Sequence, residues 1–280
     1  ESQRWEEALT AARSCGKVEA WWCAALEAFS LHGLQRYVEA DRSFSIALGL
    51  MDPEQALQWQ IPNWVIDDDG KDAFQKAEES SLKSLLSALE QLWFLADPLY
   101  LVEGNDRKTE HYARWTVATI RSEARNPYRI SWGKDLDELT IRHGWELGWE
   151  RNSDSGFSLA EQVIGHKHPE GRDYIPSGRV LNTPSIADPN DMTADHERPR
   201  SLYAPAYAPI LLPMEGQVAL FPRGDNVVIV GTHFLPLDTT RHVDHGHPLP
   251  WLDPGTQSGM LDRAGMFLRN IDGGRSEERR

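Results

Sequence analysis

The sequence has little of what nucleic-acid-binding and membrane-spanning proteins need. Its 280 residues include 29 Lys or Arg against 43 Asp or Glu, a formal net charge of -14. Affinity for nucleic acid comes mainly from basic side chains that neutralise phosphates, so this balance opposes such a partner. No run approaches the roughly 18 to 20 apolar residues of a membrane helix. We therefore expect no nucleic-acid partner and no transmembrane segment in this chain.

The usual motifs for nucleophilic and nucleotide chemistry are missing as well. There is no Gly-x-Ser-x-Gly motif, no phosphate loop and no dinucleotide fingerprint. We therefore predict no catalytic residue and no cofactor. The triplet Arg223-Gly224-Asp225 matches an adhesion motif, but a hairpin turn needs the same Gly and Asp, and we favour the turn.

The N-terminus lacks an initiator Met, and Glu1 to Glu7 do not have the charged-then-apolar pattern of a signal peptide. Trp5, Leu9 and Ala12 already follow helical spacing, which predicts a helix over Gln3 to Ser14. A chain that opens directly into a helix indicates an N-terminus cut by processing or incomplete.

Cysteine is scarce, and Cys15 and Cys23 flank Gly16 at a predicted turn between two helices. A pair this close to one turn could form a disulfide that joins the helices, which would indicate an oxidising compartment. The alternative is two free core cysteines, because free Cys is among the most buried residue types. The sequence leaves both interpretations open.

Residues 21–53 have the length of one helix-turn-helix repeat. They resemble a tetratricopeptide repeat (TPR) in the spacing of Tyr37, Ala40, Phe44, Ala47 and Pro53. They depart from that family in Ala24, where Trp is common, and in Gln35, where Gly is common. Because about three repeats are needed for stability, other elements must complete the packing.

The TPR resemblance implies roles for the matching residues. Small Ala28 and Ala40 would let two helices approach closely, and Tyr37 and Phe44 would fill the groove between them. Pro53 would end the second helix.

Three further segments are predicted before residue 121. Gln58 to Gly70 is expected to be an acidic, turn-like connector. Apolar periodicity predicts one amphipathic helix from Lys71 to Trp93. Another helix is expected to start at Asp106, whose side chain would cap it, and to run through Ile120.

Two linked patterns occupy the middle of the chain. They consist of Leu92-Trp93, Asp97-Pro98, Asn105, Glu110-His111-Tyr112 and Arg114, followed by Trp132-Gly133-Lys134-Asp135 and His143-Gly144. Over about Leu89 to Arg151 the chain resembles the GWxTD domain. The departures are Ser131 for Gly, Lys134 for Thr, Ala96 for a common Arg, and Trp145-Glu146 for a common Pro-Pro.

The GWxTD resemblance implies an exported bacterial protein that combines helical repeats with β-rich parts, and it supplies no catalytic residues. Asp97-Pro98 is expected to end a helix, and Glu110 and Arg114 to form an ion pair on one helix face. The functional alternative places Glu110, His111 and Asp135 together as an acid-base set.

The second half is rich in His, Pro and Gly, and we expect strands there. The clearest pattern is a hairpin of Gln217 to Pro222 and Asn226 to Leu235. Apolar residues on both faces suggest a strand inside a sandwich. A short strand is expected at Ala264 to Leu268 and a disordered, charged tail at Asn270 to Arg280.

This half contains candidates for two kinds of ligand site, a metal site and a sugar-binding site. The metal candidates are His166, His168 and His245, within a group that also includes His233, His242 and His247. A cupin would be the precedent, although Pro169 intervenes before Glu170, so no metal site is predicted. Trp145 and Trp149 could form a sugar-stacking platform, but core packing is the simpler interpretation.

The sequence thus predicts an α+β chain of four regions. They are a TPR-like helical region (1–88), a GWxTD-like region (89–152), a β-rich, sandwich-like domain (153–269) and a polar tail (270–280). The predicted function is a non-enzymatic structural or protein-interaction subunit of an exported or envelope-associated bacterial assembly, bound to protein partners. The alternatives are a cupin-like metal-dependent enzyme and a carbohydrate-binding module. The predicted location is extracytoplasmic.

Overall fold

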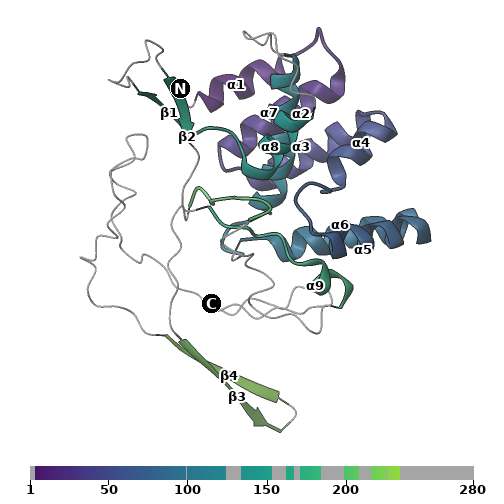
Figure 1. Ribbon diagram of the computed structural model, residues 1–280, viewed down its shortest axis with the longest axis vertical. Coiled ribbons are helices and arrows are strands. Elements are labelled where there is room, and N and C mark those ends of the chain that lie inside the picture. Colours follow the sequence, from purple (N-terminus) through teal and green to yellow (C-terminus); the bar gives the residue numbers. More distant parts are fainter. Residues whose placement is uncertain are drawn as a thin grey trace.

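The computed structural model describes residues 4–98, 100–123, 134–152, 162–166, 171–183, 199–207, 216–224 and 226–233. The fold is α+β, with helices dominating the first half and two short antiparallel strand pairs in the second (Figure 1). Within these ranges, no helix has the length and apolar character needed to cross a membrane.

The three predicted N-terminal helices are confirmed as α1 (Trp5–Arg13), α2 (Ala20–Gly33) and α3 (Tyr37–Leu50). The turn between α2 and α3 places Gln35 at a φ of 60°, in the left-handed region. Glycine enters that region at no steric cost, whereas Gln35 adopts it with a Cβ.

The residues expected to pack between α2 and α3 are all buried. Ala28 and Ala40 are fully buried, as are Tyr37 and Phe44 to within 3%. Another element completes this helix pair, because α7 (Asp106–Glu123) packs against both helices. The ring of Phe44 lies 5.4 Å from that of Tyr112 on α7, so the groove holds a helix from the middle of the chain.

Two expectations for the next segment are corrected in part. Helix α3 ends at Leu50, before Pro53, and Pro53 is the first residue of α4 (Pro53–Gln60), where its missing N–H costs no hydrogen bond. The turn-like connector expected over Gln58 to Gly70 is limited to residues 61–67, because α5 (Asp68–Ser80) begins within the acidic run. The carboxylate of Asp67 accepts a hydrogen bond from the Gly70 N–H at 2.8 Å and so caps α5.

The single helix predicted over Lys71 to Trp93 is two helices, α5 and α6 (Leu82–Ala96). The chain is extended at Ser81, whose hydroxyl accepts a hydrogen bond from the Ser84 N–H at 3.1 Å. A serine side chain that caps a new helix competes with continuation of the old one. The break was not predicted because the apolar spacing of α5 continues into α6. The helix ends before Asp97, as expected.

The predicted start of α7 at Asp106 is confirmed, but its cap is a different residue. The side-chain oxygen of Asn105 accepts a hydrogen bond from the Lys108 N–H at 2.8 Å. The carboxylate of Asp106 is therefore available for other contacts. The next helix, α8 (Asp135–His143), packs against α7. We call helices α1 to α8 the helical body.

One hydrophobic core takes side chains from α2 through α8, so it crosses the predicted boundary between residues 88 and 89. Tryptophans fill its centre. The ring of Trp115 on α7 stacks with those of Trp59 at 5.9 Å and Trp64 at 5.2 Å. Helix α7 is thus the axis around which the body packs (Figure 1).

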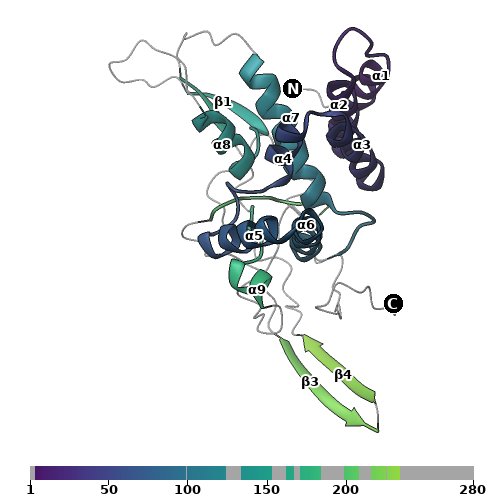
Figure 2. The same ribbon diagram turned by 90° about the vertical axis from the view of Figure 1, so that its right-hand side faces the viewer.

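The β elements are small. β1 (Gly148–Asn152) pairs antiparallel with β2 (Gln162–His166), and the short helix α9 (Gly178–Asn182) packs against α5. The predicted hairpin is confirmed as β3 (Gly216–Arg223) and β4 (Asn226–His233), with Arg223 opposite Asn226. It extends away from the helices in both ribbon views (Figures 1 and 2).

The hairpin turn agrees with the turn interpretation, because Gly224 has a φ of 62°. In the part of the chain that the structure describes, β3 and β4 form a two-stranded sheet without a second layer. Asp225, residues 234–235, the predicted strand at 264–268 and the tail at 270–280 lie outside the described residues.

Candidate functional site

Charged and polar side chains gather on one face of α7 and are buried there. We call this set the α7 polar cluster. It consists of His32, Asp106, Arg107, Glu110, Arg114, Asp173, Ser201 and Tyr203, each at most 8% exposed. Asp106, Glu110 and Arg114 are four residues apart on the helix, which places them on one face.

A chain of hydrogen bonds joins α2 to α7 through this cluster. Nε2 of His32 lies 2.8 Å from Oε2 of Glu110, and Nδ1 of His32 lies 2.9 Å from the Thr109 hydroxyl. The other oxygen of Glu110 accepts a hydrogen bond from Nε of Arg114 at 2.6 Å. The predicted Glu110–Arg114 pair is confirmed, and it is buried at the centre of a network.

Arg114 uses its remaining donors to hold two other segments. Its guanidinium donates to the backbone carbonyls of Ile141 at 3.1 Å, Arg142 at 2.8 Å and Leu202 at 2.5 Å. Gly144 passes close by with a φ of 75°, and a Cβ there would lie 3.3 Å from the guanidinium. Arg114 thus ties the end of α8 and the 199–207 segment to α7.

The ionisation of Glu110 depends on its two neighbours, Arg114 and His32. Burial alone would raise its pKa, but Arg114 and the hydrogen bond from His32 outweigh burial and lower the pKa to about 2. Glu110 is therefore a carboxylate at neutral pH, paired on both oxygens.

The N-terminal end of α7 holds the segments that follow β2. The hydroxyl of Tyr203 donates to Oδ2 of Asp106 at 2.7 Å. Arg107 donates to the Ser201 hydroxyl at 3.1 Å, and that hydroxyl donates to Asp173 at 2.9 Å. The Arg107 guanidinium also lies 5.7 Å from the centre of the Tyr203 ring. These contacts fix the 171–183 and 199–207 segments against α7.

Burial shifts the pKa values of three side chains at this end of α7. It raises the pKa of Asp106 to about 6, although the Tyr203 hydrogen bond opposes the shift. It lowers the pKa of Arg107 to about 10, helped by the charge of Arg114. It lowers the pKa of His111 to about 3, and Arg107 adds to this effect. His111 is therefore neutral at pH 7.

The geometry suits positioning better than chemistry on a substrate. Every member of the cluster is closed off from solvent, and their partners are other side chains and backbone carbonyls of the same chain. Among the described residues, Oδ1 of Asp106 and Nε and Nη1 of Arg107 are buried without a hydrogen-bond partner. Such groups are costly to bury, so the cluster is sensitive to substitution.

The acid-base set of Glu110, His111 and Asp135 does not assemble. Glu110 faces His32 and Arg114, whereas Nε2 of His111 lies 3.0 Å from the carbonyl of Trp59 in the core. Asp135 is exposed at the first turn of α8. Because the three side chains lie in different environments, this alternative is wrong.

Several residues of the first of the two linked patterns pack together in the core. The side-chain amide of Asn105 donates to the carbonyl of Trp93, and the rings of Trp93 and His111 lie 4.9 Å apart. Tyr112 and Arg114 contribute the buried contacts described above. Trp132 and Gly133 lie outside the described residues.

The histidine candidates are mostly outside the described part. Nε2 of His166, on β2, lies 3.1 Å from Glu150 of β1. The backbone of His233 ends β4, while His168, His242, His245 and His247 are outside the described residues. Within the described ranges, no group of three or more His, Cys, Asp or Glu is arranged to hold a metal ion.

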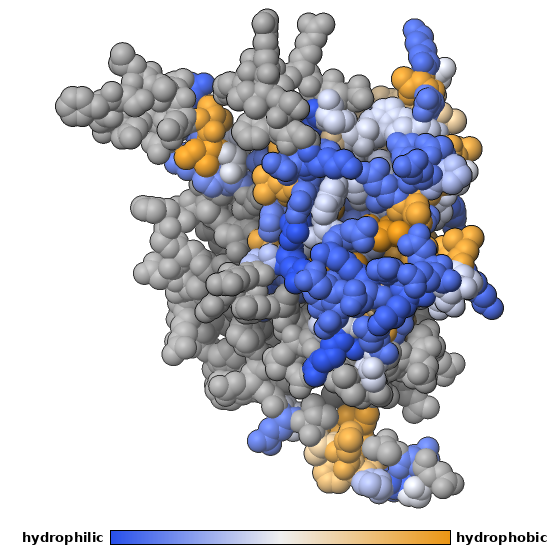
Figure 3. Space-filling model, turned by 45° about the vertical axis from the view of Figure 1, so that its right-hand side comes forward, coloured by the Kyte–Doolittle hydropathy of each residue, from blue (hydrophilic) through white to orange (hydrophobic). Residues whose placement is uncertain are grey.

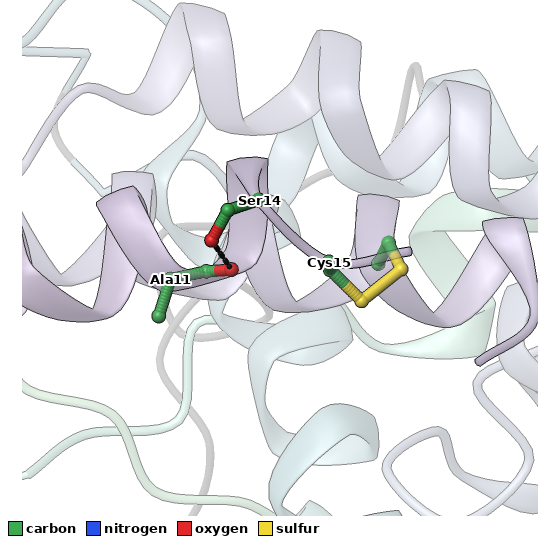
Figure 4. Close-up of a disulfide and its surroundings, with 4 residues drawn as sticks. Ala11, Ser14 and Cys15 are labelled. Atoms are coloured by element: carbon green, nitrogen blue, oxygen red, sulfur yellow. Dashed lines mark hydrogen bonds between the residues drawn. A yellow bond between two sulfur atoms is a disulfide. The ribbon is translucent and has the colours of Figure 1, made fainter. Parts of the chain in front are cut away.

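Cys15 and Cys23 form a disulfide, with Cα atoms 5.7 Å apart (Figure 4). It closes the loop between α1 and α2, next to Ser14, whose hydroxyl donates to the Ala11 carbonyl at 3.0 Å. Of the two interpretations left open by the sequence, the disulfide is the one present.

The two tryptophans weighed as a sugar platform differ in environment. Trp145 lies against the core, with its ring 5.6 Å from Phe29, as expected of a packing residue. Trp149 is 55% exposed on β1. A Cβ on Gly165 of β2 would lie 3.1 Å from its ring, so Trp149 covers the backbone of its neighbouring strand.

Sequence reasoning missed five of the eight residues of the cluster, namely His32, Arg107, Asp173, Ser201 and Tyr203. His32 is 78 residues from Glu110, and Tyr203 is 97 from Asp106, so no local spacing links them. The polar residues at four-residue spacing on α7 were the available signal. Comparisons with family models, curated proteins and solved structures found no match for this chain.

Proposed function

We propose that this chain is a non-enzymatic structural or protein-interaction subunit of an exported or envelope-associated bacterial assembly. One observation carries the proposal: the β3–β4 hairpin extends from the helical body (Figure 2), and its apolar side chains are exposed to solvent (Figure 3). Leu220 is 64% exposed, Phe221 54%, Val230 42% and Val228 40%. Exposed apolar clusters of this kind mark interaction sites.

The closed state of the α7 polar cluster supports the non-enzymatic part of this proposal. Its acid-base groups are buried and paired, and they join segments that are distant in sequence. Because the cluster is buried and holds the fold together, the exposed hairpin is the element available for contact with a partner.

The Cys15–Cys23 disulfide supports the extracytoplasmic location. Disulfides form and persist in oxidising compartments and are rare where glutathione and thioredoxin keep thiols reduced.

The finer fold assignments belong to this proposal. Helices α1 to α3 are a TPR-like array whose groove α7 fills, supported by buried Ala28, Ala40 and Phe44. The β-rich half is a sandwich-like unit that includes β3 and β4, supported by the apolar residues on both faces of the hairpin. We also propose that the chain is a divergent relative of GWxTD proteins.

Photocross-linking in cells tests the function. A photoreactive amino acid replaces Phe221 on the hairpin or, as a control, the exposed Glu78 on α5. We expect a cross-linked protein partner from Phe221 in the extracytoplasmic fraction and none from Glu78. Absence of a partner at every hairpin position, or a cytoplasmic location, would contradict the proposal.

A second candidate, a carbohydrate-binding module, rests on Trp149 alone. Its exposed ring offers a flat surface of the kind on which sugars stack. Titration with bacterial glycans should shift Trp fluorescence in the native chain and not in Trp149→Ala. An equal shift in both would remove this candidate.

A further inference from the structure

The register of the hairpin determines which backbone groups face outward. A two-residue turn joins Arg223 to Asn226, so this pair exchanges hydrogen bonds within the hairpin. Hydrogen-bonded and non-hydrogen-bonded pairs alternate from there along the strands. The outer edge of β4 therefore presents the backbone groups of four residues, Val227, Ile229, Gly231 and His233.

The outer edge of β3 is a poorer site for another strand. By the same alternation it presents Gly216, Val218, Leu220 and Pro222. Pro222 has no N–H to donate, and prolines on strands are confined to such edge positions. The hairpin thus has one edge suited to strand addition, that of β4. In the described residues, no strand pairs with it.

The β4 edge is complementary to itself. The segment from Asn226 to His233 contains no Asp, Glu, Lys or Arg, so two copies meet without like charges. An antiparallel register centred on Val230 places all four outward-facing residues in hydrogen-bonded pairs, with Ile229 opposite Gly231 of the second copy. Val230 then faces Val230 of the second copy in a non-hydrogen-bonded pair, where cross-strand apolar contacts stabilise a sheet.

The position of the hairpin allows a second copy to pair despite the net charge. The net charge of -14 opposes contact between two copies, but the hairpin extends away from the helices, so the outer edge of β4 can pair while the helical parts stay apart (Figure 2). Because only one edge of the hairpin is suited to pairing, the association closes at two chains.

We propose that two copies of this chain pair antiparallel along the outer edges of β4, forming a four-stranded sheet β3-β4-β4-β3 centred on Val230. This four-stranded sheet is larger than a two-stranded hairpin, which is only marginally stable by itself in water. This inference rests on the proposed function, since it names the partner of the same hairpin.

Engineered cysteines on the full chain test the pairing and its register. In the proposed sheet the two Val230 Cα atoms lie about 4.5 Å apart, within disulfide range. The two Thr232 residues are four positions apart along the strands, more than about 13 Å. The native cysteines are bonded to each other and do not compete.

We expect the full chain to be a dimer that dissociates on dilution, measured by sedimentation. Mild oxidation should cross-link Val230→Cys at least about tenfold faster than Thr232→Cys, given these separations. A chain that is monomeric at every concentration would overturn the proposal, as would equal cross-linking of the two variants.

A matched proline pair tests which edge is used. Ile229 and Leu220 are opposite each other in the hairpin, and each faces outward on its own strand. Ile229→Pro removes an N–H from the β4 edge and should raise the dimer dissociation constant at least about tenfold, whereas Leu220→Pro should leave it unchanged. Equal effects of the two substitutions would overturn the proposal, and the cysteine pair decides it if Ile229→Pro does not fold.

The two proposals fail in different ways. A monomeric chain whose Phe221 still cross-links to another protein in cells would sink self-pairing and leave the proposed function standing. A β4-paired dimer with no cross-linked protein other than itself would confirm the pairing and contradict a role within a larger assembly.

Discussion

The helical body and the β3–β4 hairpin distribute polar and apolar groups in opposite ways. Around α7 the body buries ionisable side chains such as Glu110, Arg114 and Asp106, and much of its surface is hydrophilic (Figure 3). The hairpin leaves Leu220 and Phe221 more than half exposed. The stability of the body therefore depends on its buried polar contacts, whereas that of the hairpin depends on whether its exposed apolar side chains are covered.

In the helical body the buried pair of Glu110 and Arg114 finds its partners within the chain, on α2, α7, α8 and the 199–207 segment. The hairpin lacks a covering layer in the described residues, and two strands alone are marginal in water. A region whose buried ion pair is held by contacts within the same chain can act as a scaffold. A region with exposed apolar strands needs contact with another surface.

The largest effect should come from breaking the buried pair in the body. Arg114→Met leaves the Glu110 carboxylate buried beside a neutral side chain. Removing one partner of a buried ion pair costs about 3–5 kcal/mol, so we expect that loss in the free energy of unfolding measured with urea.

The matched control is Arg142→Met on α8. Arg142 forms an ion pair with Glu138 at the same four-residue spacing, but both side chains are about one-third exposed. Such pairs contribute roughly 0–1 kcal/mol. Similar losses in the two variants would show that burial of the α7 polar cluster does not set its contribution.

The next effect concerns the pH dependence of the body. Burial raises the pKa of Asp106 to about 6, above the roughly 3.9 of an unfolded Asp. The folded protein therefore binds more protons than the unfolded chain between these values, and stability falls as pH rises from about 4 to about 6. The gap corresponds to about 3 kcal/mol.

Asp106→Asn should remove most of this fall, measured as the free energy of unfolding at pH 4 and pH 6.5. Part of the slope should remain, because burial also raises the pKa of Asp173. The lowered pKa of Glu110 acts in the opposite direction and in a lower window, since its contribution is lost as pH falls from about 4 toward 2. An unchanged slope in Asp106→Asn would contradict the assignment.

A smaller loss is expected from opening the disulfide. Cys15 and Cys23 are eight residues apart, and closing a loop of that size stabilises a fold by about 2–3 kcal/mol in the chain-entropy treatment. The double variant Cys15→Ser, Cys23→Ser should lose that amount in urea, while its self-association through β4 stays unchanged. A change in association would mean that the body and the hairpin are coupled.

Local patterns in the sequence predicted the elements whose determinants are local. The α1 to α3 helices follow from apolar spacing, and the hairpin follows from alternation around Gly224. The break at Ser81 was missed because the apolar period continues through it, and a capping hydroxyl is a weaker signal than apolar residues that recur at helical spacing on both sides of it.

The candidate site was predictable only on α7. The Glu110–Arg114 pair follows from helical spacing, and the structure confirms it. His32, Asp173 and Tyr203 come from segments that tertiary packing brings to the helix, and a single sequence has no period that records such contacts. The same limit explains why Asp106 was expected to cap α7 when its partner is Tyr203.

The smallest effect on the stability of the body should come from the most apolar part of the surface. Phe221→Ser on the hairpin should change the free energy of unfolding of the helical body by no more than about 0.5 kcal/mol, because that ring is 54% exposed. Phe44→Ala, its core counterpart at 1% exposure, should cost about 3–5 kcal/mol. Urea unfolding followed by Trp fluorescence does not report on the hairpin directly, because the hairpin contains no Trp. A loss above about 2 kcal/mol in Phe221→Ser would mean that the hairpin supports the body, and the contrast between them would then be one of exposure and not of independence.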